Sequence, residues 1–301
     1  MGNRSELVLA IDVGATKIAI ALVDQSHQII DKSEVPSGSN PDLWSDLEKA
    51  VKALAGAHLK ELSGVGIASA GPIDRISGEI SPVNIPGWRN FPLVAKLREL
   101  TSADRVVLHG DAMALANAEH KVGAARDIQN FLGIVVSTGI GGGLVLNNQL
   151  YLGESGNVSY FGHHIINFDE SSTCGCGRRG CLEQYARGPM MVERASRHGW
   201  AGDDFKTLAE SARTGDSAAI EAIDYGSRAL AIGCINILQS LDIHTVVIGG
   251  GVAQAGDVYW QPLRQHFINE SKAIGFLKKI DLIPAQLERD AGLIGAALAL
   301  A

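Results

Sequence analysis

The sequence has no long apolar segment and no strong excess of charge. Its N-terminal stretch, MGNRSELVLAIDVGATK, contains only a short apolar run that Asp12 interrupts, which is typical neither of a signal peptide nor of a membrane span of about 20 apolar residues. The formal net charge of −7 and the isoelectric point near 5.7 argue against a broad surface for nucleic acid or an anionic membrane. We therefore expect a cytoplasmic protein with no nucleic-acid or membrane partner.

The sequence also lacks low-complexity stretches, heptad arrays and a G-x-G-x-x-G motif at a first strand-to-helix turn. The absence of that motif argues against a Rossmann fold that binds a dinucleotide. The chain does have enough apolar material for more than one core, because 46% of its 301 residues are hydrophobic. Two lobes are therefore expected.

Three of the four cysteines form a cluster with metal-ligand spacing. Cys174, Cys176 and Cys181 give C-x-C-x4-C, and the pair His163 and His164 lies ten or eleven residues upstream. Structural zinc takes four nitrogen or sulfur ligands in a closed tetrahedron, and the glycines between the thiols allow the tight turns that this requires. The spacing predicts a Cys3His zinc site with either histidine as the fourth ligand. Disulfides or uncoordinated thiols are the alternative.

A turn of small residues follows the first predicted strand. Residues 7–11 and 18–23 are expected to be buried strands, and D-V-G-A-T-K between them exposes backbone to a phosphate and adds a hydroxyl. Its carboxylate can hold Mg²⁺ directly or through water. A plain hairpin turn with a capped aspartate is the alternative. The candidate phosphate-binding residues are Asp12, Gly14, Ala15, Thr16 and Lys17.

Two more glycine-rich turns follow later strands. Residues 131–136 and 144–146 are expected to be strands around S-T-G-I-G-G-G, which is suited to the phosphates of ATP, and a hairpin without a ligand is the alternative. The strand at 245–248 leads into G-G-G-V-A, an arrangement that suits a nucleotide. The candidate ATP-binding residues are Thr138, Gly139, Gly141 and Gly142 in the first turn, and Gly250 and Gly251 in the second.

Asp111 lies at a strand-to-helix corner, between a strand at 106–108 and a helix at 112–120. It is either an N-cap or a functional carboxylate, since an aspartate can accept a hydroxyl proton late in phosphoryl transfer. Apolar periodicity predicts further helices at 41–62, 189–200, 205–213, 217–240 and 290–297. Asn84, in the proline-rich loop S-P-V-N-I-P-G-W, is either a substrate contact or part of a surface loop that Trp88 anchors.

The spacing G-x-x-G-x-x-x-x-x-G-H at 153–163, followed by C-x-C-G-x-x-G-C-x-E at 174–183, resembles the signature of the ROK family of bacterial sugar kinases and repressors. The resemblance implies an α/β fold of the actin-like ATPase (ribonuclease H-like) class with two duplicated lobes. These would be residues 1–120, completed by a C-terminal helix at 289–301, and residues 121–288. It also implies an ATP-dependent hexose kinase, with ATP, Mg²⁺ and structural Zn²⁺ as cofactors, in a homodimer.

The same resemblance implies roles for individual residues. Asp111 would be the general base for the sugar hydroxyl, and His163 would bind zinc through one ring nitrogen and the sugar through the other. Gly71, Asn84 and Glu183 would contribute to the sugar pocket.

Three positions differ from the family pattern: Ala15 replaces a glycine, Gly110 an asparagine, and Tyr160 the glutamate of E-x-G-H. Tyr160 is a candidate sugar-binding residue, and its bulk favours N-acetylmannosamine over glucose or another hexose. A sugar-binding protein with impaired catalysis is an alternative of another class, although Asp12 and Asp111 are retained. A repressor needs a helix-turn-helix before the first phosphate loop, and only eleven residues precede Asp12.

Overall fold

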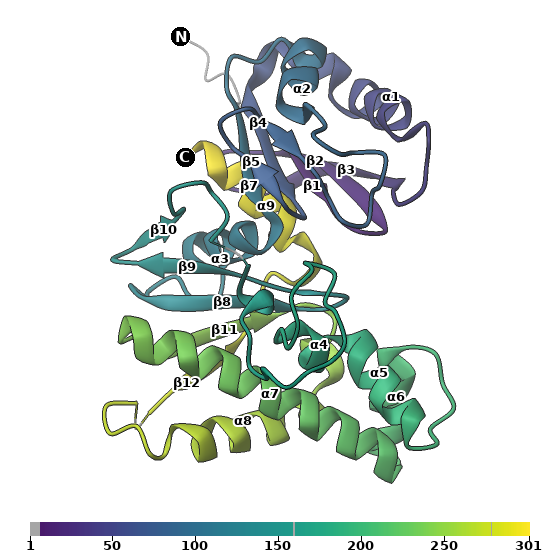
Figure 1. The fold of residues 1–301 in the computed structure, drawn as a ribbon. Helices are drawn as coiled ribbons and strands as arrows, with labels where there is room; N and C mark the ends of the chain where they lie inside the picture. The colour runs from purple at the N-terminus through teal and green to yellow at the C-terminus, as the bar shows by residue number, and fades with distance from the viewer. Residues whose placement is uncertain (1–6, 159, 278) are drawn as a thin grey trace. The chain divides into compact units, whose positions relative to one another are not determined.

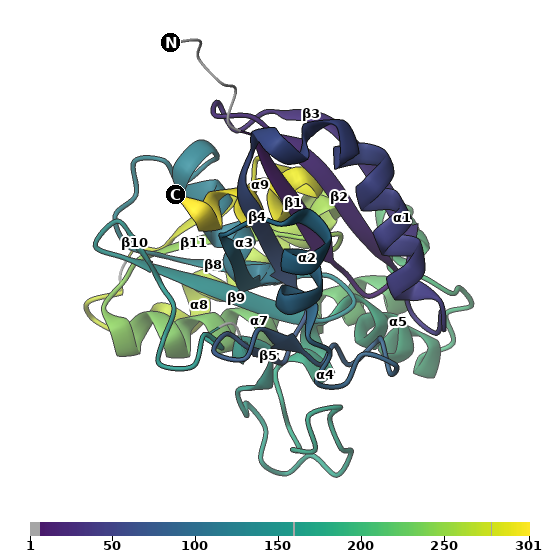
Figure 2. The ribbon, with the colours of Figure 1, turned by 90° about the horizontal axis from the view of Figure 1, so that it is seen from above.

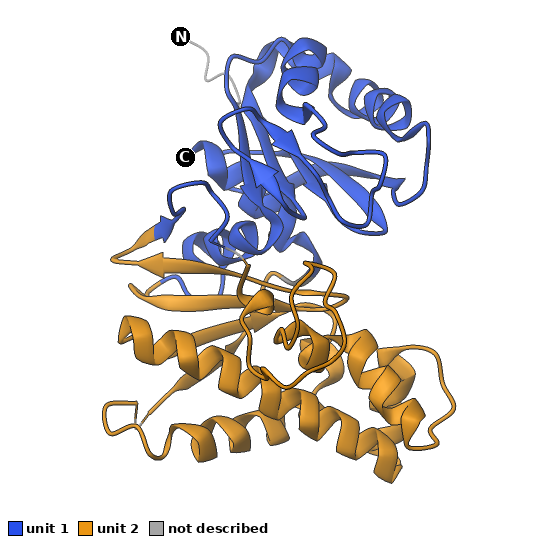
Figure 3. Ribbon diagram, in the orientation of Figure 1, with its two compact units in different colours: residues 1–126, 150–159, 289–301 blue, residues 127–149, 160–288 orange. Residues whose placement is uncertain are grey.

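The computed structural model describes residues 7–158, 160–277 and 279–301, and it divides into two compact units (Figure 3). The first comprises residues 1–126, 150–159 and 289–301, and the second comprises residues 127–149 and 160–288. Residues 152–158 follow strand β10 (Gln149–Tyr151) of the second sheet in sequence but belong to the first unit. The side chain of Asn157 accepts a hydrogen bond from the N–H of Ile73 at 3.3 Å and donates to its carbonyl at 2.9 Å.

The first unit is built on a five-stranded sheet with the order β3-β2-β1-β4-β7 (Figure 1). Strand β1 is antiparallel to β2 and parallel to β4, which is parallel to β7. The strands are β1 Leu7–Val13, β2 Lys17–Val23, β3 Ile29–Pro36, β4 Leu62–Ser69 and β7 Val106–Gly110. Alternation along β1 directs Leu9 and Ile11 to one face of the sheet, and Ala10 and Asp12 to the other.

Large apolar side chains fill one face of this sheet and small ones fill the other. Helices α1 and α2 pack on the first face, and α3 and α9 on the second (Figure 1). A Cβ on Gly66 would lie 1.8 Å from the carbonyl oxygen of Ala296, and one on Gly295 would lie 1.9 Å from that of Ala114. The second face therefore requires small residues. The helices are α1 Leu43–Ala55, α2 Leu93–Thr101, α3 Asp111–Val122 and α9 Ala291–Ala297.

The second unit contains a sheet with the order β10-β9-β8-β11-β12, in which β8 is antiparallel to β9 and parallel to β11. The long helix α7 packs against α4, α5, α6 and α8. The strands are β8 Phe131–Val136, β9 Ile140–Leu146, β10 Gln149–Tyr151, β11 Thr245–Gly249 and β12 Asp281–Pro284. The helices are α4 Glu183–Ala186, α5 Gly188–Arg197, α6 Phe205–Arg213, α7 Ser217–Leu241 and α8 Asp257–Ser271.

Short elements complete both units. A two-stranded ribbon pairs β5 (Ile73–Asp74) with β6 (Glu79–Ile80). The 3-10 turns are Gly56–Glu61, Tyr160–His163, Ala253–Ala255, Glu288–Asp290 and Leu298–Leu300. None of the helices in the described ranges combines the length and apolar character needed to cross a bilayer.

The predicted helix at 41–62 is too long at both ends. Helix α1 begins at Leu43 and ends at Ala55, a 3-10 turn follows, and Leu62 already belongs to β4. The apolar positions Leu43, Leu47 and Val51 are buried as a helical period requires, but this period does not continue beyond Ala55.

Candidate functional site

The turn after β1 is closed by its own backbone. The N–H of Gly14 donates to the carbonyl of Lys17 at 3.0 Å, and Ser37 binds the carbonyls of Gly14 and Thr16. The predicted phosphate-binding residues 14–17 thus form one tight turn, with Ala15 half-buried and the Thr16 side chain exposed. The Gly14 N–H is engaged inside this turn and the Lys17 ammonium pairs with Glu34, so neither is free for a ligand in this arrangement.

Asp12 lies at the base of this turn and is packed against α9. A Cβ on Gly292 would lie 2.2 Å from its Oδ2, so that glycine makes room for the carboxylate. Burial and then the negative charge of Asp111 raise the pKa of Asp12 to about 7, while Lys17 opposes the shift. A carboxyl in this environment is poised to bind a cation that relieves the repulsion.

Asp111 opens α3 at the end of β7. Gly110 is the N-cap, so Asp111 is the first helical residue and not the cap that the sequence left as an alternative. The N–H of Ala112 donates to its Oδ1 at 2.7 Å. The side chain of Asp111 is partly open to solvent. The surrounding protein nevertheless removes much of the water around the carboxyl, and this desolvation raises its pKa. The first unit therefore places an accessible, proton-accepting carboxylate near Asp12.

A pocket of about 190 Å³ opens beside Asp12, between β2, β3 and the segment before α9. Its charged side chains are largely paired, Lys17 with Glu34 and Lys32 with Asp290. Because these charges are paired, the pocket has little excess positive charge with which to bind an anion.

In the second unit, three segments meet at the turn after β8. The N–H of Gly188 donates to the carbonyl of Ser137 at 3.0 Å, and the N–H of Val252 donates to that of Val136 at 3.1 Å. A Cβ on Gly251 would lie 3.7 Å from the hydroxyl of Ser137. The turns at 137–139 and 249–251, each predicted to bind nucleotide, are therefore neighbours, and residues 187–188 form a third side.

The sequence reasoning missed Arg187, which precedes α5 at this junction. Its Nη1 donates to the carbonyl of Thr138 at 3.3 Å. The signal was present, because this arginine comes four residues after Glu183, the last position of the cysteine signature, and directly before a Gly-Pro helix start.

The predicted glycine loop after β8 is wrong in its extent. Strand β9 begins at Ile140, so only residues 137–139 form the turn, with the Thr138 side chain exposed. Gly141 and Gly142 are strand residues that pair with β8. A Cβ on Gly142 would lie 2.5 Å from the ring of Phe161, so this glycine admits the 160–163 turn against β9.

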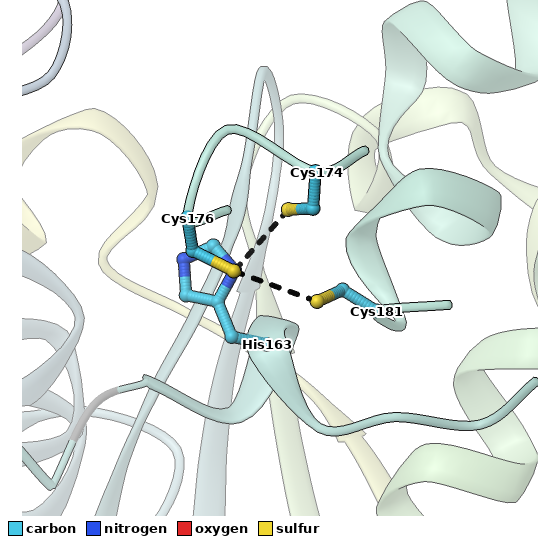
Figure 4. A group of neighbouring side chains, drawn as sticks. All are labelled: His163, Cys174, Cys176 and Cys181. Carbon is cyan, nitrogen blue, oxygen red and sulfur yellow. Dashed lines mark hydrogen bonds between the residues drawn. The ribbon is translucent and has the colours of Figure 1, made fainter. Parts of the chain in front are cut away.

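The four predicted metal ligands converge, as Figure 4 shows. The donor atoms of His163 and the three cysteines all lie within 4.8 Å of one another. The Nδ1 of His163 is 3.6 Å from the Sγ of Cys174, and the Sγ atoms of Cys176 and Cys181 are 3.6 Å apart. Two thiolates bound to tetrahedral zinc at about 2.3 Å would lie roughly 3.8 Å apart, so these residues fit the ion. The competing His164 is outside the group and stands edge-on to Phe161.

The loop that carries the cysteines is held by backbone contacts. The N–H of Cys174 donates to the carbonyl of Arg178 at 2.7 Å, and the N–H of Ile166 donates to that of Gly180 at 2.9 Å. Gly180 has φ of 72°, and a Cβ there would lie 1.6 Å from the carbonyl oxygen of Asn167. Figure 2 shows the loop extending away from α4. Glycine at position 180 is therefore a geometric requirement of the cluster.

Glu183 links the cysteine cluster to the turn after β8. Its Oε1 is 3.3 Å from the Sγ of Cys174 and 3.6 Å from the Nδ1 of His163. A Cβ on Gly139 would lie 3.5 Å from its Oε2. The ring of Tyr160 lies 5.4 Å from that of His163. Three of the predicted sugar-binding residues are thus gathered beside the cluster.

The other predicted sugar-binding residues, Gly71 and Asn84, belong to the first unit. Gly71 lies half-buried between β4 and β5, and Asn84 is exposed in the loop before α2. That loop is anchored by Trp88, which is buried and stacks on Phe91 with ring centroids 4.3 Å apart. Asn84 is therefore carried by a fixed loop while its own side chain faces solvent.

Comparison with known proteins extends over nearly the whole chain. The model of the ROK family matches residues 8–301. An N-acetylmannosamine kinase from Shigella flexneri is 35% identical over 294 residues, which cover 97% of each chain.

Solved structures agree in fold. A ROK hexokinase from Thermus thermophilus superposes with a TM-score of 0.84 at 33% identity, covering 97% of both chains. A ROK family glucokinase from Streptomyces griseus, determined in complex with glucose and AMPPNP, superposes with a TM-score of 0.83 at 30% identity, covering 97% of this chain and 98% of that one. The fold is thus the actin-like ATPase fold, as the cysteine signature predicted.

Proposed function

The chain belongs to the ROK family, and we propose that it is a kinase that transfers the γ-phosphoryl group of ATP to a hexose hydroxyl, the 6-hydroxyl of N-acetylmannosamine being the preferred acceptor. The observation that carries the proposal is the pair of carboxylates in the first unit. Asp111 is accessible and has a raised pKa, and the nearby Asp12 is half-buried at the base of a tight turn.

Asp111 acts as the general base. As the sugar oxygen forms its bond to the γ-phosphorus, the bond from that phosphorus to the β,γ-bridging oxygen breaks, and the hydroxyl proton passes to the carboxylate of Asp111. ADP leaves with the electron pair of the broken bond. Phosphoryl transfer needs mainly positioning and charge neutralisation, so a base that accepts the proton late is sufficient.

Asp12 is suited to hold Mg²⁺, directly or through water. The repulsion from Asp111 and the burial that raise its pKa are both relieved by a divalent cation. Bound Mg²⁺ would neutralise charge on the ATP phosphates. In this proposal the exposed hydroxyls of Thr16 and Thr138, in the turns at 14–17 and 137–139, contact the phosphates, and Gly250 and Gly251 adjoin the adenosine.

His163, Cys174, Cys176 and Cys181 hold one structural zinc ion, which fixes the loop that carries them. Because Nδ1 of His163 faces the thiols, its Nε2 remains to donate to or accept from a sugar hydroxyl in this proposal. Glu183 accepts from neighbouring hydroxyls. A carboxylate and an imidazole held by one rigid cluster orient the sugar at little entropic cost.

The choice of sugar rests on Tyr160. Its ring lies close to that of His163, where an aromatic surface accommodates an axial acetamido group better than a carboxylate does. Glucose is the second candidate, because the hexokinase and glucokinase structures are similar along the whole chain.

A coupled assay of ADP formation over N-acetylmannosamine, N-acetylglucosamine, glucose, mannose and fructose tests the proposal. We expect the highest kcat/KM with N-acetylmannosamine. A preference for glucose would retain the kinase and reject the substrate. Binding of a sugar without any ADP formation would instead identify a sugar-binding protein without catalysis.

A further inference from the structure

Arg187 carries hydrogen-bond donors that the protein does not use. Its Nη1 donates to the carbonyl of Thr138 at 3.3 Å, and its Nη2 contacts the Sδ of Met190, a weak acceptor, at 3.6 Å. Its Nε is buried and has no hydrogen-bond partner among the described residues. A guanidinium has five N–H donors in a rigid fork, and leaving a buried charged donor unpaired is unfavourable. These donors are therefore available to a ligand.

The N-terminus of α5 cannot supply such donors itself. The N–H of Gly188 is bonded to the carbonyl of Ser137, Pro189 has no N–H, and the N–H of Met190 is bonded to the carbonyl of Arg187. The side chain of Arg187, and not the first turn of the helix, is thus the donor group that α5 offers to the turn at 137–139.

The charge on each side of that turn is different. Glu183 and Arg187 stand at the two ends of α4, four residues apart, and they flank the same turn. The carboxylate of Glu183 is beside Gly139, whereas the guanidinium of Arg187 is bonded to Thr138. A carboxylate suits sugar hydroxyls and repels phosphate, and a guanidinium matches the geometry of phosphate oxygens.

We propose that Arg187 binds an oxygen of the ATP phosphate chain at the turn after β8. The inference rests on the proposed kinase function and deepens it, because it assigns a residue to the nucleotide phosphates. Lys17, at the corresponding turn of the first unit, is already paired with Glu34. Of Lys17 and Arg187, it is therefore Arg187 that has unused hydrogen-bond donors next to a predicted phosphate-binding turn.

The test compares ligands with and without phosphates. Calorimetric affinities for Mg²⁺·AMP-PNP and for adenosine are measured for the wild type, Arg187→Ala and Arg187→Lys, at two ionic strengths. Arg187→Ala should weaken AMP-PNP binding about 10- to 100-fold and leave adenosine binding within about twofold. It should also reduce the salt dependence of AMP-PNP binding, and Arg187→Lys should restore part of the affinity. The control is Arg194→Ala, since Arg194 lies on α5 but pairs with Glu221.

The outcomes separate this inference from the proposed function. If the wild type binds no AMP-PNP, the kinase proposal and the role of Arg187 both fail. If the wild type binds AMP-PNP but Arg187→Ala binds it equally well, only the role of Arg187 is rejected. Equal weakening of AMP-PNP and adenosine, with unchanged salt dependence, would mean that Arg187 only shapes the turn, which also overturns the inference.

Discussion

The two five-stranded sheets have the same strand order, but the turns at their equivalent positions differ in chemistry. In each sheet a central strand is followed by an antiparallel neighbour, β1 by β2 and β8 by β9, and it also pairs in parallel with a later strand. The first turn has the half-buried carboxylate of Asp12 at its base. The second is a short backbone turn between Glu183 and Arg187.

The difference shows that the shared strands supply a scaffold while other elements supply the chemistry. In the first unit, β7 contributes Asp111 through its connection to α3, and α9 leaves space for Asp12. In the second, α4 and the cysteine loop contribute the charged groups and the candidate metal ligands. We expect substitutions in the first unit to reduce turnover and those in the second to reduce ligand affinity.

The largest effect is expected from Asp111→Asn. The amide keeps the shape of the side chain but cannot accept the hydroxyl proton, so kcat should fall about 10²- to 10⁴-fold while the Kd of AMP-PNP stays within about threefold. Steady-state kinetics and calorimetry measure the two quantities. Near-normal turnover in this variant would assign the base to another residue.

In the second unit, Cys181→Ser should reduce the zinc content from one ion per chain and weaken sugar binding about tenfold or more, because the loop that holds His163 and Glu183 loses its anchor. Elemental analysis and sugar titrations measure both effects. Cys234→Ala is the matched control, since this buried cysteine lies on α7 outside the cluster. Unchanged zinc in Cys181→Ser would remove this residue from the metal site.

A smaller effect is expected from Tyr160→Glu, which tests whether the second unit also selects the sugar. A carboxylate at this position should shift the ratio of kcat/KM values toward glucose about tenfold, since hydrogen bonds to hydroxyls discriminate more strongly than an apolar ring. The ratio is needed because the substitution can lower both rates. An equal loss for glucose and N-acetylmannosamine would show that Tyr160 does not determine specificity.

The smallest effect concerns how Asp12 changes the stability of the protein with pH. Its folded pKa of about 7 exceeds the ordinary value of 3.8, so in Mg²⁺-free buffer this group makes the protein less stable as pH rises from about 4 to 7. Asp12→Asn cannot ionise, so its melting temperature should exceed that of the wild type by a few degrees at pH 8 and by less at pH 5. Thermal unfolding at both pH values measures the difference. Parallel pH profiles for the two proteins would contradict the raised pKa.

Sequence patterns predicted elements well where burial and local geometry agree. The strand at residues 131–136 and the helix at 205–213 appear at their predicted bounds, and the cysteine spacing identified donors that meet in space. Such features depend on residues near one another in the chain.

Features set by distant contacts were not predictable in this way. Glycines usually weaken strands, so Gly141 and Gly142 suggested a loop, but both pair with β8 and the ring of Phe161 occupies the space beside Gly142. The sequence places Arg187 just after the cysteine signature, but its role depends on a distant contact, because α4 carries it to the carbonyl of Thr138 in the turn after β8. The helix predicted at 41–62 was likewise too long, because Leu62 already belongs to β4, whose pairing with β1 is a distant contact.

The close packing of α9 has a consequence for how the protein forms during synthesis. Strands β1 and β4 are translated before the second unit, but α9, which with α3 covers their alanine and glycine face, is translated only after it. At about 5–20 residues per second, the part of this face that α9 covers remains open for tens of seconds after α3 has been made, while most of the second unit can already fold. The first unit to be translated is therefore the last to be completed, and its nascent form is the one we expect to need protection by chaperones.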